Sequence, residues 1–211
     1  GLRAAYVSMT CTRGRMPPGR RDLRTAQSMF YCYAVPFVWI SRPEQQQTGA
    51  RLWISDVTRI PPQSVDPTVK NYHWLDLDLA LLDAYDHHAD LVVLRDLSGA
   101  VSEGPGYNVF AHSAGRWLTP GRGTLAGITR RSLIELAREA GQQVDEGVLT
   151  AADLLAADEV LVTSTAGGIM PVTVVDGVPV GSGTPGPLTR KLRDLYWASH
   201  QDPRYSTPVR Y

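Results

Sequence analysis

Two residues of this chain, Lys70 and Glu103, are of types that carry covalent and acid–base chemistry. Lys70 is one of only two lysines among the 21 basic residues, and it lies between a proline-rich stretch and a helical pattern. A lysine amine that projects into a cleft and is partly desolvated acts as a Schiff-base nucleophile and proton carrier. The alternative is a solvated lysine at a helix start, because most lysines are exposed.

Glu103 belongs to the glycine-rich run Glu103-Gly104-Pro105-Gly106. Glycines let a backbone approach a flat ligand closely, which would leave this carboxylate facing it. Opposite a pyridine ring nitrogen, a carboxylate keeps that nitrogen protonated and makes the ring an electron sink. The alternative is an ordinary turn glutamate.

Two further glycine turns carry hydroxyl groups. Gly127-Ile128-Thr129 opens a helix, where free N–H groups and the positive end of the helix dipole bind phosphate, although an ordinary N-cap has the same pattern. Ser164-Thr165-Ala166-Gly167-Gly168 follows a strand and could equally be a tight turn. An amine, a carboxylate and two such turns are together the parts of a pyridoxal phosphate site.

This set of motifs resembles the class IV aminotransferases, pyridoxal phosphate enzymes of fold type IV. The resemblance covers essentially the whole chain, and the nearest likeness within the class is to the (R)-selective amine transaminases. The matching segments are Val69-Lys70-Asn71, Glu103 to Asn108, Pro120-Gly121-Arg122-Gly123, Gly127-Ile128-Thr129-Arg130 and Thr165 to Pro171, with Asp66-Pro67-Thr68 and Trp74 for the amine type.

The resemblance implies a role for each matching residue. Lys70 would hold the cofactor as a Schiff base and move a proton between substrate Cα and cofactor C4′, while Glu103 would pair with the ring nitrogen. The other implied cofactor-binding residues are Ile128, Thr129, Thr165, the neighbouring Ser164, and Asn108, and the implied substrate-binding residues are Trp74, Gly167 and Gly168.

Substrate choice is predicted from an arginine-rich loop. In the amine transaminases, an arginine on a mobile loop meets the carboxylate of a keto acid and swings away for an apolar amine. Residues 13–24 match this loop, with Arg20 as first candidate and Arg21 as second, unless the loop is simply solvated. The leading hypothesis is an (R)-amine type aminotransferase with small amine and keto acid substrates. The alternatives are a branched-chain or D-amino-acid aminotransferase, an aminodeoxychorismate lyase, and an inactive dimerising fragment.

Composition narrows the class of protein. Net charge is zero and the sequence pI is about 7.1, so neither a nucleic acid nor a membrane is an expected partner. Cys11 and Cys32 show no metal-ligand spacing with the histidines and lie in apolar runs, which predicts buried free thiols, no metal site and a reducing cytosol. A homodimer is expected.

Strand and helix patterns alternate irregularly, which predicts an α+β fold. Helices are predicted over residues 73–88, 129–140 with Thr129 as N-cap, 150–156 and 187–200, and residues 91–118 read as a mostly antiparallel meander. The resemblance implies the end of a small domain over residues 1–40, a linker over 41–48, and a large cofactor-binding domain over 49–211. It also implies a phosphate-binding arginine upstream of this chain.

Overall fold

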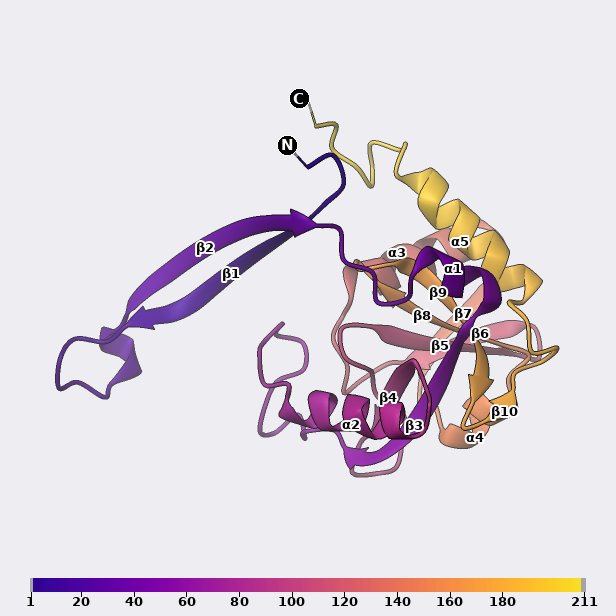
Figure 1. Cartoon of the computed structure of the whole chain (residues 1–211), viewed down its shortest axis with the longest axis horizontal. Coiled ribbons are helices and arrows are strands. Elements are labelled where there is room, and N and C mark those ends of the chain that lie inside the picture. Colours follow the sequence, from indigo (N-terminus) through magenta and orange to yellow (C-terminus); the bar gives the residue numbers. More distant parts are fainter. Residues whose placement is uncertain (1, 210–211) are drawn as a thin grey trace. The chain divides into compact units, whose positions relative to one another are not determined.

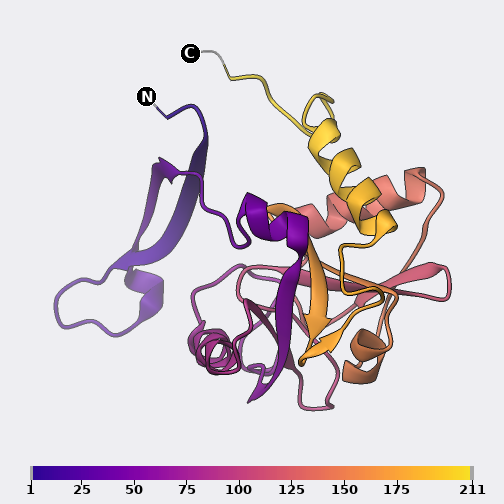
Figure 2. The ribbon, with the colours of Figure 1, turned by 45° about the vertical axis from the view of Figure 1, so that its right-hand side comes forward.

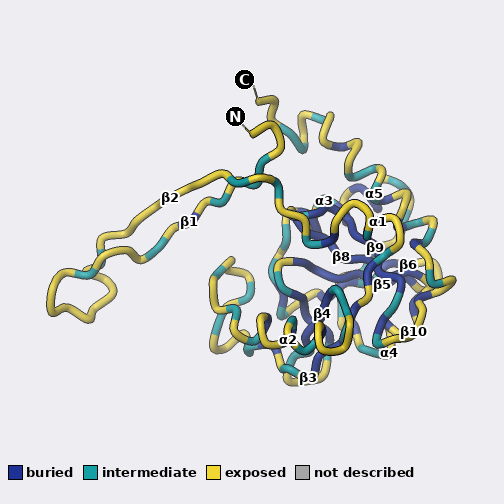
Figure 3. Tube along the Cα trace, viewed as in Figure 1, coloured by how far each residue is buried: buried dark blue, intermediate teal, exposed yellow. Residues whose placement is uncertain are grey.

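The computed structural model describes residues 2–209 and shows two compact units, one ending at residue 39 and the other beginning at residue 40. The first unit is an antiparallel hairpin of β1 (Ala5–Arg15) and β2 (Gln27–Pro36), joined through a loop that includes the 3-10 turn Leu23–Thr25. Most of its residues are exposed (Figure 3).

Cys11 and Cys32 lie on the two strands of this hairpin, and both are free and exposed. The prediction of buried thiols is therefore wrong. The apolar residues around them suggested a core, but a two-stranded ribbon has no second layer within its own unit to cover either face.

The second unit is built on a mixed sheet that has eight strands within the described residues, in the order β4-β3-β9-β8-β5-β6-β7 with β10 paired to β9 (Figure 1). The strands are β3 (Ala50–Thr58), β4 (Leu91–Arg95), β5 (Asn108–Ser113), β6 (Arg116–Pro120), β7 (Gln143–Gly147), β8 (Glu159–Ser164), β9 (Gly168–Val175) and β10 (Val178–Pro179). β3 runs parallel to β4 and β9, β6 runs parallel to β7, and the other neighbours are antiparallel.

The antiparallel meander predicted for residues 91–118 is confirmed at its two ends and is wrong in its middle. β4 pairs with β3 and not with β5, because a helical crossover returns the chain beside β3 in the parallel sense. Residues 100–103 do return antiparallel beside β4, through an isolated bridge between Val101 and Arg95 and a hydrogen bond from Ser102 N to Leu94 O. β5 and β6 pair antiparallel as predicted, whereas the other neighbour of β5 is β8 and not residues 100–103.

Five helices of the described residues pack around the sheet: α1 (Pro43–Thr48), α2 (Leu75–Asp86), α3 (Ile128–Glu139), α4 (Ala151–Leu155) and α5 (Pro187–Ser199). Alternate strand residues face different cores. Val109 of β5 belongs to a large core on one face, whereas Phe110 packs under α3 and α5 with Leu133 and Leu192, and Leu77 of α2 packs on β4. Figures 1 and 2 show α3 and α5 crossing the same side of the sheet.

The structure confirms the α+β class and the four predicted helices, with small changes at their ends. Thr129 is not the N-cap of α3: Gly127 is, and Thr129 lies buried in the first turn. Residues 41–48, predicted as a linker, hold α1 of the second unit, where the buried Gln46 donates hydrogen bonds to the carbonyls of Ser41 and Gly167. No apolar pattern in the sequence indicated this helix, because it is anchored through polar groups.

Within residues 2–209, each helix is too short or too polar to cross a lipid bilayer. The same residues contain no cluster of three or more His, Cys, Asp or Glu side chains able to hold a metal ion.

Candidate active site

The candidate site lies at the carboxyl ends of the parallel strands β3 and β4. Arg59 directly follows β3, and its N–H donates to the carbonyl of Arg95 at the end of β4. After a short turn the chain returns beside β4, where Glu103 accepts from Leu94 N through its main-chain oxygen at 3.0 Å. Ligands of sheets with parallel strands bind beyond the carboxyl ends of those strands. A ligand is therefore expected at the carboxyl ends of β3 and β4.

Glu103 is buried and its carboxylate is fixed from both sides. One oxygen, Oε1, lies 3.2 Å from Arg59 Nη2, and the other, Oε2, accepts from Thr124 Oγ1 at 3.0 Å and Leu125 N at 2.9 Å. The residue is only 6% exposed. A carboxylate held by this many donors has little freedom to rotate, so its direction is set before any ligand arrives.

Arg59 and Thr124 were missed by the sequence reasoning. The Arg59 guanidinium is buried between two acids, with Nη1 at 2.7 Å from Asp76 Oδ2 in the first turn of α2 and Nη2 on Glu103. A charged residue at the end of a largely apolar strand, just before two prolines, was the available signal. Burial of an arginine requires paired acids, and those acids lie 17 and 44 positions away in sequence.

Asn108 supports the loop that carries Thr124. Its amide Nδ2 donates to Thr124 Oγ1 at 2.8 Å and to Leu125 O at 2.9 Å. A methyl group on Gly127 would lie 2.2 Å from Asn108 Oδ1, so this approach requires glycine. The hydrogen bonds of Asn108 therefore fix the residues that lead into α3.

The N-terminus of α3 lacks a side-chain cap, because Gly127 occupies the N-cap position. The first N–H groups of a helix have no acceptor within the helix, and with the helix dipole they attract anions. Ile128 is 64% exposed, whereas Thr129 is buried. Burial raises the pKa of the Tyr196 phenol on α5, and a hydrogen bond with Thr129 offsets part of that rise.

The turn between β8 and β9 is tied to residues 103–107, which precede β5 and are called the Glu103 loop here. Ser164 Oγ donates to Gly106 O at 2.8 Å and accepts from Ala166 N at 3.1 Å. Thr165 is exposed at the tip of the turn, and the carbonyl of Gly167 accepts from Gln46 Nε2. Ser164 and Thr165 therefore differ in kind: the first is structural in its recorded bonds, and the second is available to a ligand.

Trp74 brings the connection between β3 and α2 back to the Glu103 loop. Its indole nitrogen donates to Asn71 O at 3.0 Å, and a methyl group on Gly106 would lie 3.6 Å from the end of its ring. Lys70 lies earlier in the same connection and is exposed. Within residues 2–209, Lys70 Nζ has no recorded hydrogen bond or ion pair, so its amine is chemically available but is not in contact with Glu103.

Arg20 is exposed in the loop between β1 and β2 of the first unit. The other predicted site residues all belong to the second unit. Arg20 therefore stays a prediction.

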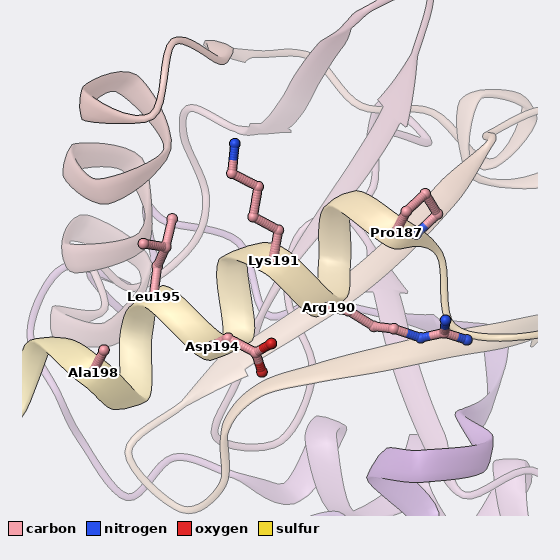
Figure 4. Close-up of a pocket in the computed structure, with 6 residues that line it drawn as sticks. All are labelled: Pro187, Arg190, Lys191, Asp194, Leu195 and Ala198. Atoms are coloured by element: carbon pink, nitrogen blue, oxygen red, sulfur yellow. The ribbon is translucent and has the colours of Figure 1, made fainter.

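A separate hollow of about 610 Å³ runs along α5 and is lined by Pro187, Arg190, Lys191, Asp194, Leu195 and Ala198. Figure 4 shows Lys191, the second lysine, pointing away from Arg190 and Asp194. The six side chains come from one helix face and do not converge on a common point. The hollow lacks the opposed groups of an active site, which makes Lys191 a useful control for Lys70.

Comparison with known proteins decides the family. The family model "Amino-transferase class IV" matches residues 1–175. The chain belongs to the class IV aminotransferase family. It is 34% identical over 197 residues to a putative branched-chain-amino-acid aminotransferase of Methanocaldococcus jannaschii, covering 92% of this chain and 67% of that protein. It is 34% identical over 157 residues to the branched-chain-amino-acid aminotransferase of Escherichia coli strain K12, covering 73% of this chain and 51% of that protein.

Solved structures of class IV enzymes share the fold. The branched-chain amino acid aminotransferase of E. coli superimposes with a TM-score of 0.87 at 30% identity, covering 92% of this chain and 65% of that one. The enzyme of Thermobaculum terrenum, solved in its PLP form, gives 0.85 at 28% identity, covering 95% and 66%. The fold type IV prediction is confirmed. This chain spans about half to two thirds of the length of these relatives.

Proposed function

We propose that this chain is the cofactor-binding part of a pyridoxal phosphate-dependent aminotransferase, which moves an amino group from a donor to a keto acid or ketone in two half-reactions. The observation that carries the proposal is the buried Glu103 carboxylate, fixed by Arg59, Thr124 and Leu125 N beside the carboxyl ends of β3 and β4. A carboxylate fixed in direction before any ligand arrives suits an acid that must face one ring nitrogen.

The residues present fit pyridoxal phosphate. When bound, this cofactor supplies an aldehyde carbon and an electron-withdrawing ring. Glu103 would hold a proton at the ring nitrogen, and the uncapped N–H groups at Ile128 and Thr129 would bind the phosphate together with the Thr165 hydroxyl. Lys70 Nζ would bind the aldehyde carbon and return a proton to the substrate.

The test is cofactor uptake with the two lysines compared. Wild-type protein mixed with pyridoxal phosphate is expected to develop the visible absorbance of a Schiff base, and amino donors are expected to bleach it. Lys70→Ala should lose both responses, whereas Lys191→Ala, at an exposed position of α5, should keep them. An identical loss in both variants, or no uptake by the wild type, would refute the proposal.

We propose branched-chain amino acids and their keto acids as the first substrate class. Support comes from the names of the relatives in two comparisons, of sequences and of structures. A simple chiral amine is the second candidate, favoured by Asp66-Pro67-Thr68-Val69-Lys70-Asn71 and Trp74. L-Leucine and (R)-1-phenylethylamine, each offered as donor with a keto acid acceptor, separate the two. Pyruvate release without an acceptor would point to a lyase instead.

We further propose a homodimer formed through one face of α2. An exposed apolar stripe, defined as Tyr72, Leu75, Leu79, Leu82 and Tyr85, follows the helix, with exposed fractions from 49% to 75%. A two-fold axis requires a surface that complements itself. The stripe reads Tyr, Leu, Leu, Leu, Tyr in both directions, so an antiparallel copy would place tyrosines opposite tyrosines and leucines opposite leucines.

Light scattering tests this interface. Leu79→Glu is expected to give a monomer, whereas Leu97→Glu, at another exposed leucine (77%) in a turn, should leave the dimer intact. A wild-type monomer at all concentrations, or a dimer that survives Leu79→Glu, would contradict the interface.

A reducing cytosol is the compartment we propose, since Cys11 and Cys32 are exposed free thiols on adjacent strands. Protein alkylated at the moment of cell lysis should carry the label on both cysteines. Recovery of a disulfide between them would contradict this compartment.

A further inference from the structure

Asp76 occupies an unusual place for an acid in the first turn of a helix. Asp76 and Asp78 both lie in the first turn of α2, where a negative charge complements the helix dipole. Asp78 is exposed, but the side chain of Asp76 is only 11% exposed and faces the Arg59 guanidinium. The dipole alone accounts for neither this burial nor this contact.

The contacts of Asp76 pin the start of α2 to the end of β3. Its Oδ2 accepts from Arg59 Nη1 at 2.7 Å and from Ile60 N at 2.7 Å, and its Oδ1 accepts from Leu77 N at 2.9 Å. The guanidinium of Arg59 then continues to Glu103 Oε1. A single buried cation thus joins the helix that follows the Lys70 segment to the acid of the Glu103 loop.

Arginine suits this position because its planar guanidinium can serve two carboxylates through different nitrogens, which a lysine cannot do with a single nitrogen. If Asp76 is removed, the Arg59 guanidinium pairs with Glu103 alone. Glu103 would then be held more tightly by Arg59 and would share less of its charge with a ligand.

We propose that Asp76 is a positioning residue that acts through Arg59. It sets how strongly Glu103 can hold a proton at the cofactor ring nitrogen. It also fixes the position of α2, and of the residues around Lys70 that lead into it, relative to Glu103. This inference rests on the proposed function. Within the described residues, Arg59 at the end of β3 is the charged side chain that pairs with Glu103, and Asp76 of α2 pairs with Arg59 in turn. The other donors to Glu103, Thr124 Oγ1 and Leu125 N, are neutral.

The test compares Asp76→Asn with Asp78→Asn. Both substitutions remove one acid from the first turn of α2, so they share the loss of helix-dipole stabilisation. Asp76→Asn is expected to raise the dissociation constant for pyridoxal phosphate about 10-fold, the lower end of the effect seen when outer-shell partners are removed at metal sites. Asp78→Asn is expected to leave the dissociation constant unchanged.

A second readout separates positioning from simple destabilisation. The pH titration of the bound cofactor's absorbance is expected to shift to lower pH in Asp76→Asn, because a Glu103 held more tightly by Arg59 stabilises the ring proton less. In an Arg59→Gln background, adding Asp76→Asn should change neither the affinity nor the titration further. Arg59→Lys keeps the charge but offers one nitrogen where arginine offers two. It is the second variant if Asp76→Asn folds poorly, and it is expected to change the affinity and the titration in the same direction.

The outcomes distinguish the role of Asp76 from the function of the site. Wild type and Asp78→Asn that bind cofactor, with Asp76→Asn and Arg59→Lys indistinguishable from them in affinity and titration, would overturn the role of Asp76 alone. Absence of cofactor binding in the wild type would overturn the proposed function, and the role of Asp76 with it. Additive effects of the Arg59 and Asp76 substitutions would also overturn the proposal, since they would show that Asp76 acts independently.

Discussion

The turn between β8 and β9 offers a sharp test of the packing that supports the site. Gly168 has a φ of +71°, and a methyl group added there would lie 2.8 Å from Tyr196 Cε1 and 3.0 Å from Trp197 Cζ2. Gly177, in the β9–β10 turn, has a similar φ of +79° with nothing within 4 Å of the added methyl. Alanine at the two positions therefore shares the backbone cost but not the clash.

The expected costs follow from these contacts. A left-handed conformation costs a non-glycine residue roughly 1–2 kcal/mol, which is the whole effect predicted for Gly177→Ala. Gly168→Ala adds about 1–3 kcal/mol of overpacking against two aromatic rings. For a chain of this size the difference corresponds to roughly 2–12 °C in Tm.

Urea unfolding followed by circular dichroism measures both variants against wild type. A free energy of unfolding that falls equally in the two variants would refute the close packing of α5 on this turn. The larger loss predicted for Gly168→Ala should also weaken phosphate binding, because Tyr196 is hydrogen-bonded to Thr129 at the start of α3.

Three further predictions concern stability. Tyr107→Phe should lower the free energy of unfolding by about 1–3 kcal/mol in urea titrations, because the buried phenol bonds both Val92 N and Val92 O at 2.7 Å, and an unchanged midpoint would contradict this. The hydrogen bond from Ser55, with lesser contributions from neighbouring groups, lowers the pKa of Asp83. The ionised Asp83 should therefore stabilise the fold above the ordinary carboxyl pKa and cease to do so as the pH falls through the pKa of the folded state. Asp83→Asn should flatten that part of the stability–pH curve. Thr150→Ala should cost about 1 kcal/mol by removing the cap of α4, and thermal unfolding with no change in Tm would show that the cap contributes nothing.

Local patterns predicted the elements of the second unit well, because periodicity and caps are properties of adjacent residues. The turn at Asp176-Gly177 has φ values of +48° and +79°, as expected for a two-residue hairpin loop. Thr150 caps α4 as predicted. Strand order was not predictable in this way, because the pairing of β4 with β3 depends on a crossover through α2 and not on local pattern.

In the candidate site too, the residues marked by a local pattern were predicted and those that act through distant contacts were not. Glu103 and the start of α3 were visible in the sequence because glycine runs mark close backbone approach. Arg59 and Asp76 were not, because their significance lies in a contact between distant segments that no spacing rule encodes. The exposure of Cys11 was also missed, since an apolar run does not say whether a second layer covers it.

The most direct test of the proposed chemistry is the location of the covalent link. Wild-type protein is incubated with pyridoxal phosphate, reduced with borohydride to trap any Schiff base, digested, and mapped by mass spectrometry. One pyridoxyl group per chain is expected, on Lys70, with Lys191 unmodified at stoichiometric cofactor. Modification of Lys191, or of both lysines equally, would contradict the assignment of Lys70.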